Sequence, residues 1–202
     1  MGRPAAKRAQ IEAAAIRLFA TKGIAETTVK DIAALAGVTE GALYRHYSGK
    51  NEMAWKLFCC EVETFSLRLR DILMSESAPF QSRLRDGVRF IYEYYSARPT
   101  EFSFILLTQH GFPRKSLLDE KRNPNDIVIR FIRTAMAHGH SAPGDPVLVT
   151  ALLMGAVLQP LVMHRYGRLK KDPRKCVEQV TRACMRLLGQ GADRGAISNG
   201  RV

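Results

Sequence analysis

Cysteine is scarce in this chain, and it occurs in no pattern that organises a fold. Four cysteines occur in 202 residues, and the spacing of Cys59, Cys60, Cys176 and Cys184 fits no zinc-binding motif. A disulfide between the adjacent Cys59 and Cys60 would be strained, which disfavours a redox-sensing pair. No long apolar run follows the basic start MGRPAAKRAQ, so we expect no secretory signal. The sequence therefore predicts a cytoplasmic protein with reduced thiols and with no bound metal or cofactor.

Signals for β-strands are almost absent, because no Asn-Gly turn joins two alternating apolar runs. Helical spacing of apolar residues recurs along the whole chain and predicts an all-α fold of about nine helices. Thr28 and Asp31 form a capping-box pattern, Gly37 ends that helix, and Thr39 can cap the next. The expected helices span about 5–21, 29–36, 40–47, 48–74, 80–97, 100–110, 126–138, 145–166 and 173–188.

Acidic residues are fewer than basic ones, at 19 against 31, which gives a formal net charge of +12. This excess favours a polyanionic partner such as nucleic acid or an anionic membrane, although charge that only solubilises the chain is an alternative. Charged residues are also absent from residues 146–163, a run at the lower length limit for a membrane-spanning helix. Thr150, Gln159 and Pro160 interrupt the run, so a buried helix at a subunit interface is the favoured interpretation.

Residues 28–50, TVKDIAALAGVTEGALYRHYSGK, have the features of a helix-turn-helix. Ala33 is small enough for the helices to cross, and Gly37 tolerates the positive φ that the turn requires. Val38 and Leu43 are apolar residues that can hold the second helix against the first. A buried helical hairpin with no role in DNA binding is the alternative.

The second helix of this motif offers side chains of the kinds that contact DNA. Gly41 and Ala42 would allow close approach, and Arg45 is long enough for bidentate contact with guanine. Tyr47 is expected in the core. Contacts with the phosphate backbone are assigned to Thr39, Tyr44, His46 and Lys50.

Three segments of the head resemble the TetR (tetracycline-repressor-like) family of bacterial transcription regulators. They are GRP at 2–4, AAAIRLFATKG at 13–23 and TTVKDIAALAGVTEGALYRHYSGKNEM at 27–53, which together cover about the first quarter of the chain. Arg45 sits where the family varies and is a candidate for sequence choice, whereas Asn51 stands where an acidic residue is common. Arg3, Lys7 and Arg8 resemble a basic arm, although a disordered end is the alternative for Arg3. The resemblance implies DNA-facing positions at Thr28, Thr39, Gly41, Ala42, Tyr44, His46 and Lys50.

The resemblance also implies a body that forms a homodimer through its last two helices and holds a small-molecule pocket. Apolar stripes give an independent reason for the dimer, since such faces would be a liability on a monomer. The stripes comprise Val149, Leu152, Leu153, Ala156, Val157 and Leu161, and then Cys176, Val180, Cys184, Leu187 and Leu188. For the pocket we select residues that are individually more typical of plain core, namely Tyr92, Phe102, Leu106, Gln109, Phe131 and Met154.

These features predict a DNA-binding domain at 1–50, a ligand-binding and dimerisation domain at 51–190 and a disordered tail at 191–202. The expected function is a ligand-responsive transcriptional regulator, most simply a repressor that a small-molecule effector releases from a palindromic operator. The histidines fall in no nucleophile or metal motif, so an enzyme is not expected. Two alternatives are a non-specific architectural DNA binder and a small-molecule enzyme that retains the head as a folding unit. The sequence leaves the effector, the operator, the target genes and the sign of regulation open.

Overall fold

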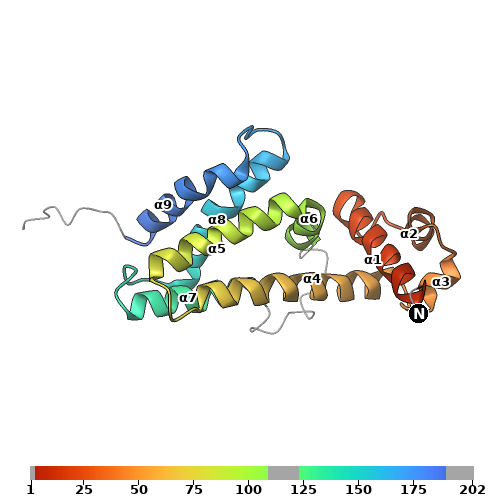
Figure 1. The fold of residues 1–202 in the computed structure, drawn as a ribbon, viewed down its shortest axis with the longest axis horizontal. Coiled ribbons are helices and arrows are strands. Elements are labelled where there is room, and N and C mark those ends of the chain that lie inside the picture. The colour runs from red at the N-terminus through yellow and green to blue at the C-terminus, as the bar shows by residue number, and fades with distance from the viewer. Residues whose placement is uncertain (1–2, 109–122, 190–202) are drawn as a thin grey trace, which may run out of the picture. The chain divides into compact units, whose positions relative to one another are not determined.

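The computed structural model describes residues 3–108 and 123–189, and every regular element in these ranges is helical (Figure 1). The all-α class and the nine α-helices expected from the sequence are confirmed for this part of the chain. In chain order the elements are α1 (Arg3–Lys22), α2 (Val29–Ala36), α3 (Glu40–Tyr44), α4 (Lys50–Leu73), α5 (Phe80–Ala97), α6 (Pro99–Thr108), α7 (Pro124–Ala137), α8 (Pro146–Arg165), the 3-10 helix η2 (Pro173–Cys176) and α9 (Val177–Leu187).

Local capping explains where several helices begin and end. The Thr28 hydroxyl accepts a hydrogen bond from the Asp31 N–H at 3.1 Å, and the Asp31 carboxylate accepts one from the Thr28 N–H at 3.0 Å. This reciprocal pair is the capping box that the sequence predicts for α2. Gly37 then ends α2 with a φ of 65°, a left-handed conformation that glycine adopts without steric cost. At α8 the Asp145 carboxylate accepts from the Val147 N–H at 2.8 Å.

The chain divides into two compact units. The first contains residues 1–68 and 97–124, and the second contains residues 69–96 and 125–202. Helices α1–α3, most of α4 and α6 thus belong to the first unit, which extends well beyond the predicted boundary at residue 50. A functional division at residue 50 stays a prediction, and the predicted tail at 191–202 lies outside the described residues.

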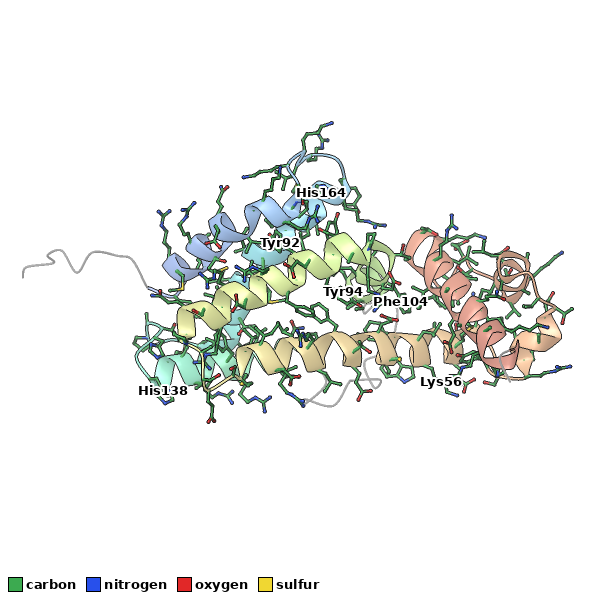
Figure 2. All side chains as sticks on the ribbon, in the orientation of Figure 1. Lys56, Tyr92, Tyr94, Phe104, His138 and His164 are labelled. Carbon is green, nitrogen blue, oxygen red and sulfur yellow. The ribbon has the colours of Figure 1, made fainter. Side chains whose placement is uncertain are left out.

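The core of the first unit is built around aromatic side chains. Phe104 of α6 has no exposed surface, and its ring lies 6.0 Å from the ring of Phe19 and 6.2 Å from that of Phe58 (Figure 2). Ile32 of α2 and Leu43 of α3 are also fully buried in this cluster. Because α6 packs against α1, the α2–α3 motif rests on a scaffold that the body segment of the sequence helps to build.

The second unit is held together by α5, α7, α8 and α9. Tyr92 of α5 is fully buried, and its hydroxyl donates to the Val157 carbonyl of α8 at 2.9 Å (Figure 2). One turn further along α5, the Tyr95 hydroxyl lies 2.9 Å from His164 Nδ1. These two contacts fix α5 against α8 on either side of Pro160, the residue inside α8 that lacks an N–H donor.

Helix α8 is apolar around most of its circumference. It is long and apolar enough to cross a membrane, the one such helix among the described residues, and only 22% of that span is buried. Leu153, Val157 and Leu161 point into the unit, whereas Leu148 and Leu152 are 59% and 52% exposed. The predicted apolar stripe on α8 therefore divides into two faces. One face is buried inside the protomer, and the other is exposed on its surface. On α9 the stripe is mostly internal, and Leu187 is its exposed member.

Candidate nucleic-acid interface and ligand cavity

The turn between α2 and α3 has the geometry that a helix-turn-helix requires. The Gly37 N–H donates to the Ala34 carbonyl at 3.2 Å, and the Val38 N–H donates to the Ala33 carbonyl at 3.0 Å. Ala33 is 3% exposed and Leu43 is fully buried, so both have the packing roles expected from the sequence. The outer face of α3 is consequently presented on a fixed support.

One face of α3 opens onto a hollow that contains two basic residues. Thr39, Ala42 and Arg45, spaced three residues apart, line this hollow together with Lys7 of α1. Its volume is about 400 Å³, and it is open to solvent. Lys7 and Arg45 give it positive charge, which suits a phosphate or the edge of a base pair.

Two small features keep the start of α3 accessible. Thr39 is the N-cap of α3, but its side chain makes no capping hydrogen bond, so its hydroxyl is available to another partner. Gly41 is exposed, and no neighbouring atom would lie within 4 Å of a side chain built there. A bulky partner such as a DNA backbone can therefore come close to the helix at this point.

Tyr44 and Tyr47 are three residues apart but occupy opposite environments. Tyr44 is 54% exposed, and the neighbouring Arg45 and His46 are exposed as well. Tyr47 is 4% exposed, and its hydroxyl donates to Glu12 Oε1 at 2.6 Å. Burial, followed by the hydrogen bond to this carboxylate, raises the pKa of Tyr47 to about 12. Its expected place in the core is confirmed.

Lys50 has a structural role that was not predicted from the sequence. Its ammonium donates to the Ala25 carbonyl at 2.7 Å and to the Thr27 carbonyl at 2.8 Å. Since a lysine ammonium has three N–H donors, one remains for a phosphate. Lys50 therefore ties the start of α4 to the turn before α2 while keeping its charge at the surface.

The hydroxyl oxygen of Thr28 is already occupied as a hydrogen-bond acceptor. Its hydroxyl accepts from the Asp31 N–H, and the Asp31 carboxylate lies 2.9 Å from Lys22 Nζ. The hydrogen bonds from Lys22 and from the Thr28 backbone lower the pKa of Asp31 to about 2. A negative charge thus already occupies the start of α2, so Thr28 can contribute only the hydrogen of its hydroxyl to an anion.

The basic residues of the predicted arm separate on α1. Lys7 faces the hollow with Arg45, whereas the Arg8 side chain pairs with Glu12 at 2.8 Å. The side chain of Arg3 is outside the described part of the molecule. Of the two arm residues whose side chains are described, Lys7 is therefore the one at the α3 face.

The second unit contains a small, partly open apolar cavity of about 30 Å³. Phe131 and Met154 line it, as two of the six residues selected from the sequence. Tyr92 is instead held by Val157, Phe102 packs in the first unit with its ring 6.5 Å from that of Phe65, and Leu106 also belongs to that unit. Gln109 lies outside the described residues. Among the described residues, the lining comprises Leu69, Leu73, Leu84, Gly87, Val88, Ile91, Val128, Phe131, Ile132, Leu153, Met154, Val157 and Cys184.

Most of this lining could not be distinguished in the sequence from ordinary aliphatic core. Cys184 is the one thiol among the described lining residues, and burial raises its pKa to about 11. The thiol is therefore protonated at neutral pH and unsuited to nucleophilic chemistry. The described walls of the cavity are thus suited to contact with apolar groups.

Comparison with known proteins finds a family model that matches part of the α1–α4 region. Residues 11–55 match the model for bacterial regulatory proteins of the tetR family. The transcriptional repressor KstR2 of Mycobacterium tuberculosis (strain H37Rv) is 35% identical over 80 residues, which are 40% of each chain. The transcriptional regulator TtgR of Pseudomonas putida is 54% identical over 50 residues, which cover 25% of this chain and 24% of TtgR. The matched regions thus span less than half of the length of these relatives.

The fold of the whole chain has close counterparts among solved structures. The transcriptional regulator FadR of Bacillus subtilis, solved with stearoyl-CoA, aligns with a TM-score of 0.68 at 17% identity. The alignment covers 91% of this chain and 98% of FadR, so the body as well as the head has the same architecture. The match over residues 11–55 and the helix-turn-helix geometry thus make this region similar to bacterial regulatory proteins of the tetR family, and the likeness to FadR shows that the fold is the same.

Proposed function

We propose that this protein regulates transcription by binding DNA through the outer face of α3. The observation that carries the proposal is the open hollow where Thr39, Ala42 and Arg45 meet Lys7. It combines two cations, a free hydroxyl and small residues on a helix held by a glycine turn, which is what groove binding needs. In this proposal Arg45 reads base edges, and Thr39, Tyr44, His46, Lys50 and Lys7 contact the backbone.

Repression is the direction of regulation that the relatives favour. KstR2 is a named transcriptional repressor and is 35% identical to this chain over 80 residues. A single helix of five residues contacts few base pairs, so two heads acting on a palindromic operator would supply the specificity that one lacks. We therefore include an operator with two half-sites in the proposal.

The outer face of α8 supports the proposal of a homodimer. Val147, Leu148 and Leu152 are each more than half exposed, and Leu187 of α9 extends the same apolar character. Gly155 is exposed and has no neighbouring atom within 4 Å of where a side chain would begin, so another helix can approach closely. Exposed apolar surface of this kind is typical of a subunit interface.

The cavity in the second unit is the proposed effector site. FadR, which has the same fold, was solved with stearoyl-CoA, a molecule with a long apolar chain. An effector that fits this unit better in one arrangement of the dimer than in another would shift the protein toward that arrangement. Affinity for the operator then changes by the difference in effector binding between the two states.

The test is equilibrium binding of the purified protein to labelled DNA from the region flanking its own gene, compared with a scrambled fragment. Arg45→Ala is expected to weaken binding to the operator by about 5- to 100-fold and to relax specificity, since a bidentate base contact is lost. Arg133→Ala, which removes an exposed arginine of α7 in the other unit, is the matched control and should leave binding unchanged. Binding should also weaken steeply with rising salt concentration.

Two outcomes would favour the other functions. Equal affinity for the native and scrambled fragments, with Arg45→Ala weakening both alike, would indicate a non-specific architectural binder. Absence of salt-sensitive binding to any fragment, together with turnover of a bound small molecule, would indicate an enzyme that retains the head as a folding unit. Either result would overturn the proposal of an operator-specific regulator.

A further inference from the structure

Arg83 of α5 is a basic residue beside the cavity that the DNA-binding function does not explain. Its guanidinium carbon lies 5.5 Å from the centre of the Phe131 ring. Its Nη1 donates to the Leu73 carbonyl at 3.1 Å. Phe131 and Leu73 both line the cavity, so the arginine is fixed at the edge of an apolar space.

One nitrogen of the Arg83 guanidinium is left without a hydrogen-bond partner. Its Nε is buried and has no hydrogen-bond partner, and no carboxylate within residues 3–108 or 123–189 pairs with Arg83. Arg89, two turns further along α5, instead donates to Asp86 at 2.6 Å. A guanidinium stays charged at any physiological pH, and its Nε–Nη2 edge matches the two oxygens of a carboxylate or phosphate. Arg83 therefore has an anion-binding edge with no anion of the protein on it.

The cavity beside Arg83 favours apolar ligand groups, whereas Arg83 itself favours an anion. None of the lining side chains in residues 3–108 and 123–189 carries an oxygen or nitrogen atom, so a polar group that entered the cavity would lose its hydrogen bonds to water. Its volume of about 30 Å³ is far below the roughly 150 Å³ of an engineered apolar cavity that binds benzene, so a ligand with an apolar chain must displace part of the wall. Met154 is suited to this displacement, because methionine is unbranched and repacks readily.

We propose that the effector is an anionic amphiphile, with an apolar chain in the cavity and a carboxylate or phosphate head on the Nε–Nη2 edge of Arg83. A neutral apolar molecule would fill the cavity but leave the buried donor of Arg83 unpaired. A small polar anion would pair with Arg83 but leave the cavity unfilled. This inference rests on the proposed function, since it names the ligand class of the effector site.

The head-group test uses octanoate, octyl phosphate and 1-octanol as probes, titrated calorimetrically into the full-length protein. We expect at least one anionic probe to bind tenfold or more tightly than octanol, a difference of about 1.4 kcal/mol. Arg83→Gln should remove this preference, whereas Arg83→Lys should keep part of it for octyl phosphate, because lysine retains the charge without the planar fork. Arg133→Gln, which alters an exposed arginine of α7, should keep the full preference. Comparing octanoate with octyl phosphate identifies the head.

The cavity test uses Gly87→Ala. A methyl group there would lie 2.9 Å from Leu73 Cδ2, so the flexible end of Leu73 must move and the space beside it changes. We expect weaker binding of all three probes with the preference for the anion retained, and circular dichroism checks that each variant is folded. Equal affinity for octanol and both anions, survival of the preference in Arg83→Gln, or no binding of any probe would overturn the inference.

The DNA assay separates this inference from the proposed function. Operator-specific binding by a protein with no preference for the anionic probes would overturn the ligand class and leave the regulator intact. A clear anionic preference in a protein that binds no DNA would support the site but overturn the regulatory role. The two results are read from separate measurements on the same preparation.

Discussion

At the scale of single residues, the head separates side chains that hold the fold from side chains that face outward. Tyr44 and Tyr47 show the separation most clearly, because the same residue type appears in both roles within one turn. The Tyr47 hydroxyl reaches Glu12 across 35 positions of sequence, whereas Tyr44 projects from the end of α3. Their different partners make a matched pair of substitutions informative.

Tyr47→Phe is expected to lower the free energy of unfolding by about 1 kcal/mol, because it removes a hydrogen bond and leaves Glu12 without it. Tyr44→Phe should leave stability unchanged and weaken binding to the operator, since its exposed hydroxyl is proposed to contact phosphate. Urea unfolding and DNA titration measure the two effects separately. Equal destabilisation by both substitutions would contradict the assigned environments.

Asp31 makes the stability of the head dependent on pH in the acid range. Its pKa is lowered to about 2 by Lys22 and by the Thr28 backbone, so the unfolded chain takes up this proton at a higher pH than the folded one. The stabilisation is therefore complete above about pH 4 and is lost as the pH falls toward about 2.

Asp31→Asn should consequently lower the melting temperature at pH 6, and the difference from the parent protein should shrink as the pH approaches 2. Thermal unfolding followed by circular dichroism at several pH values measures this difference. Glu26→Gln, which neutralises an exposed carboxylate in the same region, is the control and should show no such convergence. A difference in melting temperature that stays constant with pH would mean that the negative charge of Asp31 does not contribute to stability.

Residues whose roles depend on their immediate neighbours were predictable from the sequence, and those that depend on distant contacts were not. Ala33, Gly37 and Leu43 follow from helix spacing and turn chemistry. The bonds from Lys50 to the Ala25 and Thr27 carbonyls depend on how a turn more than 20 positions away folds back. The unpaired Nε of Arg83 could not be predicted from the sequence either, because it depends on which hydrogen-bond acceptors the folded second unit places near it.

At the scale of elements, the helix-turn-helix depends on two glycines for different reasons. Gly37 has a φ of 65°, which L side chains rarely adopt, although there is open space around it. Gly41 lies within α3 at ordinary helical geometry and also has open space around it. Glycine is required at position 37 by the left-handed backbone conformation. At position 41 it is required only if another molecule comes close to α3.

Gly37→Ala should therefore destabilise the protein by about 1 to 2 kcal/mol, the cost of a left-handed conformation for a residue with a side chain. Gly41→Ala should leave stability unchanged or raise it by up to about 1 kcal/mol, as alanine favours helix, and should weaken binding to the operator. Unfolding curves and DNA titrations on the pair distinguish these effects. Unchanged DNA affinity in Gly41→Ala would exclude close approach at this position.

Helix limits were predicted well wherever a cap or a breaker marks them in the sequence. The predicted helix at 173–188 is instead a 3-10 turn, η2, followed by α9 from Val177, a distinction that side-chain spacing does not encode. Packing partners were harder to predict, as with α6 against α1, because long-range contacts depend on the complete fold. On α8 both faces are apolar, so periodicity could not separate the inner face from the outer one.

At the scale of the whole molecule, the outer face of α8 is an apolar surface that a single chain leaves exposed to water. Burying it against a second copy would remove apolar surface from water at about 25 cal/mol for each Å². The membrane interpretation of the same helix predicts association with lipid or detergent and no defined dimer. The mass of the protein in detergent-free solution therefore decides between the two.

We expect light scattering to give twice the chain mass of 22.6 kDa at micromolar concentration. The double substitution Leu148→Glu and Leu152→Glu should shift the protein to a monomer, because both residues are more than half exposed and would place four charges at the interface of a symmetric pair. The monomer should also bind an operator with two half-sites more weakly, while its affinity for a single half-site stays unchanged. Leu67→Glu, on an exposed leucine of the first unit, is the control and should remain dimeric. A parent protein that is monomeric without detergent would contradict the dimer, and with it the proposal that two heads read one palindrome.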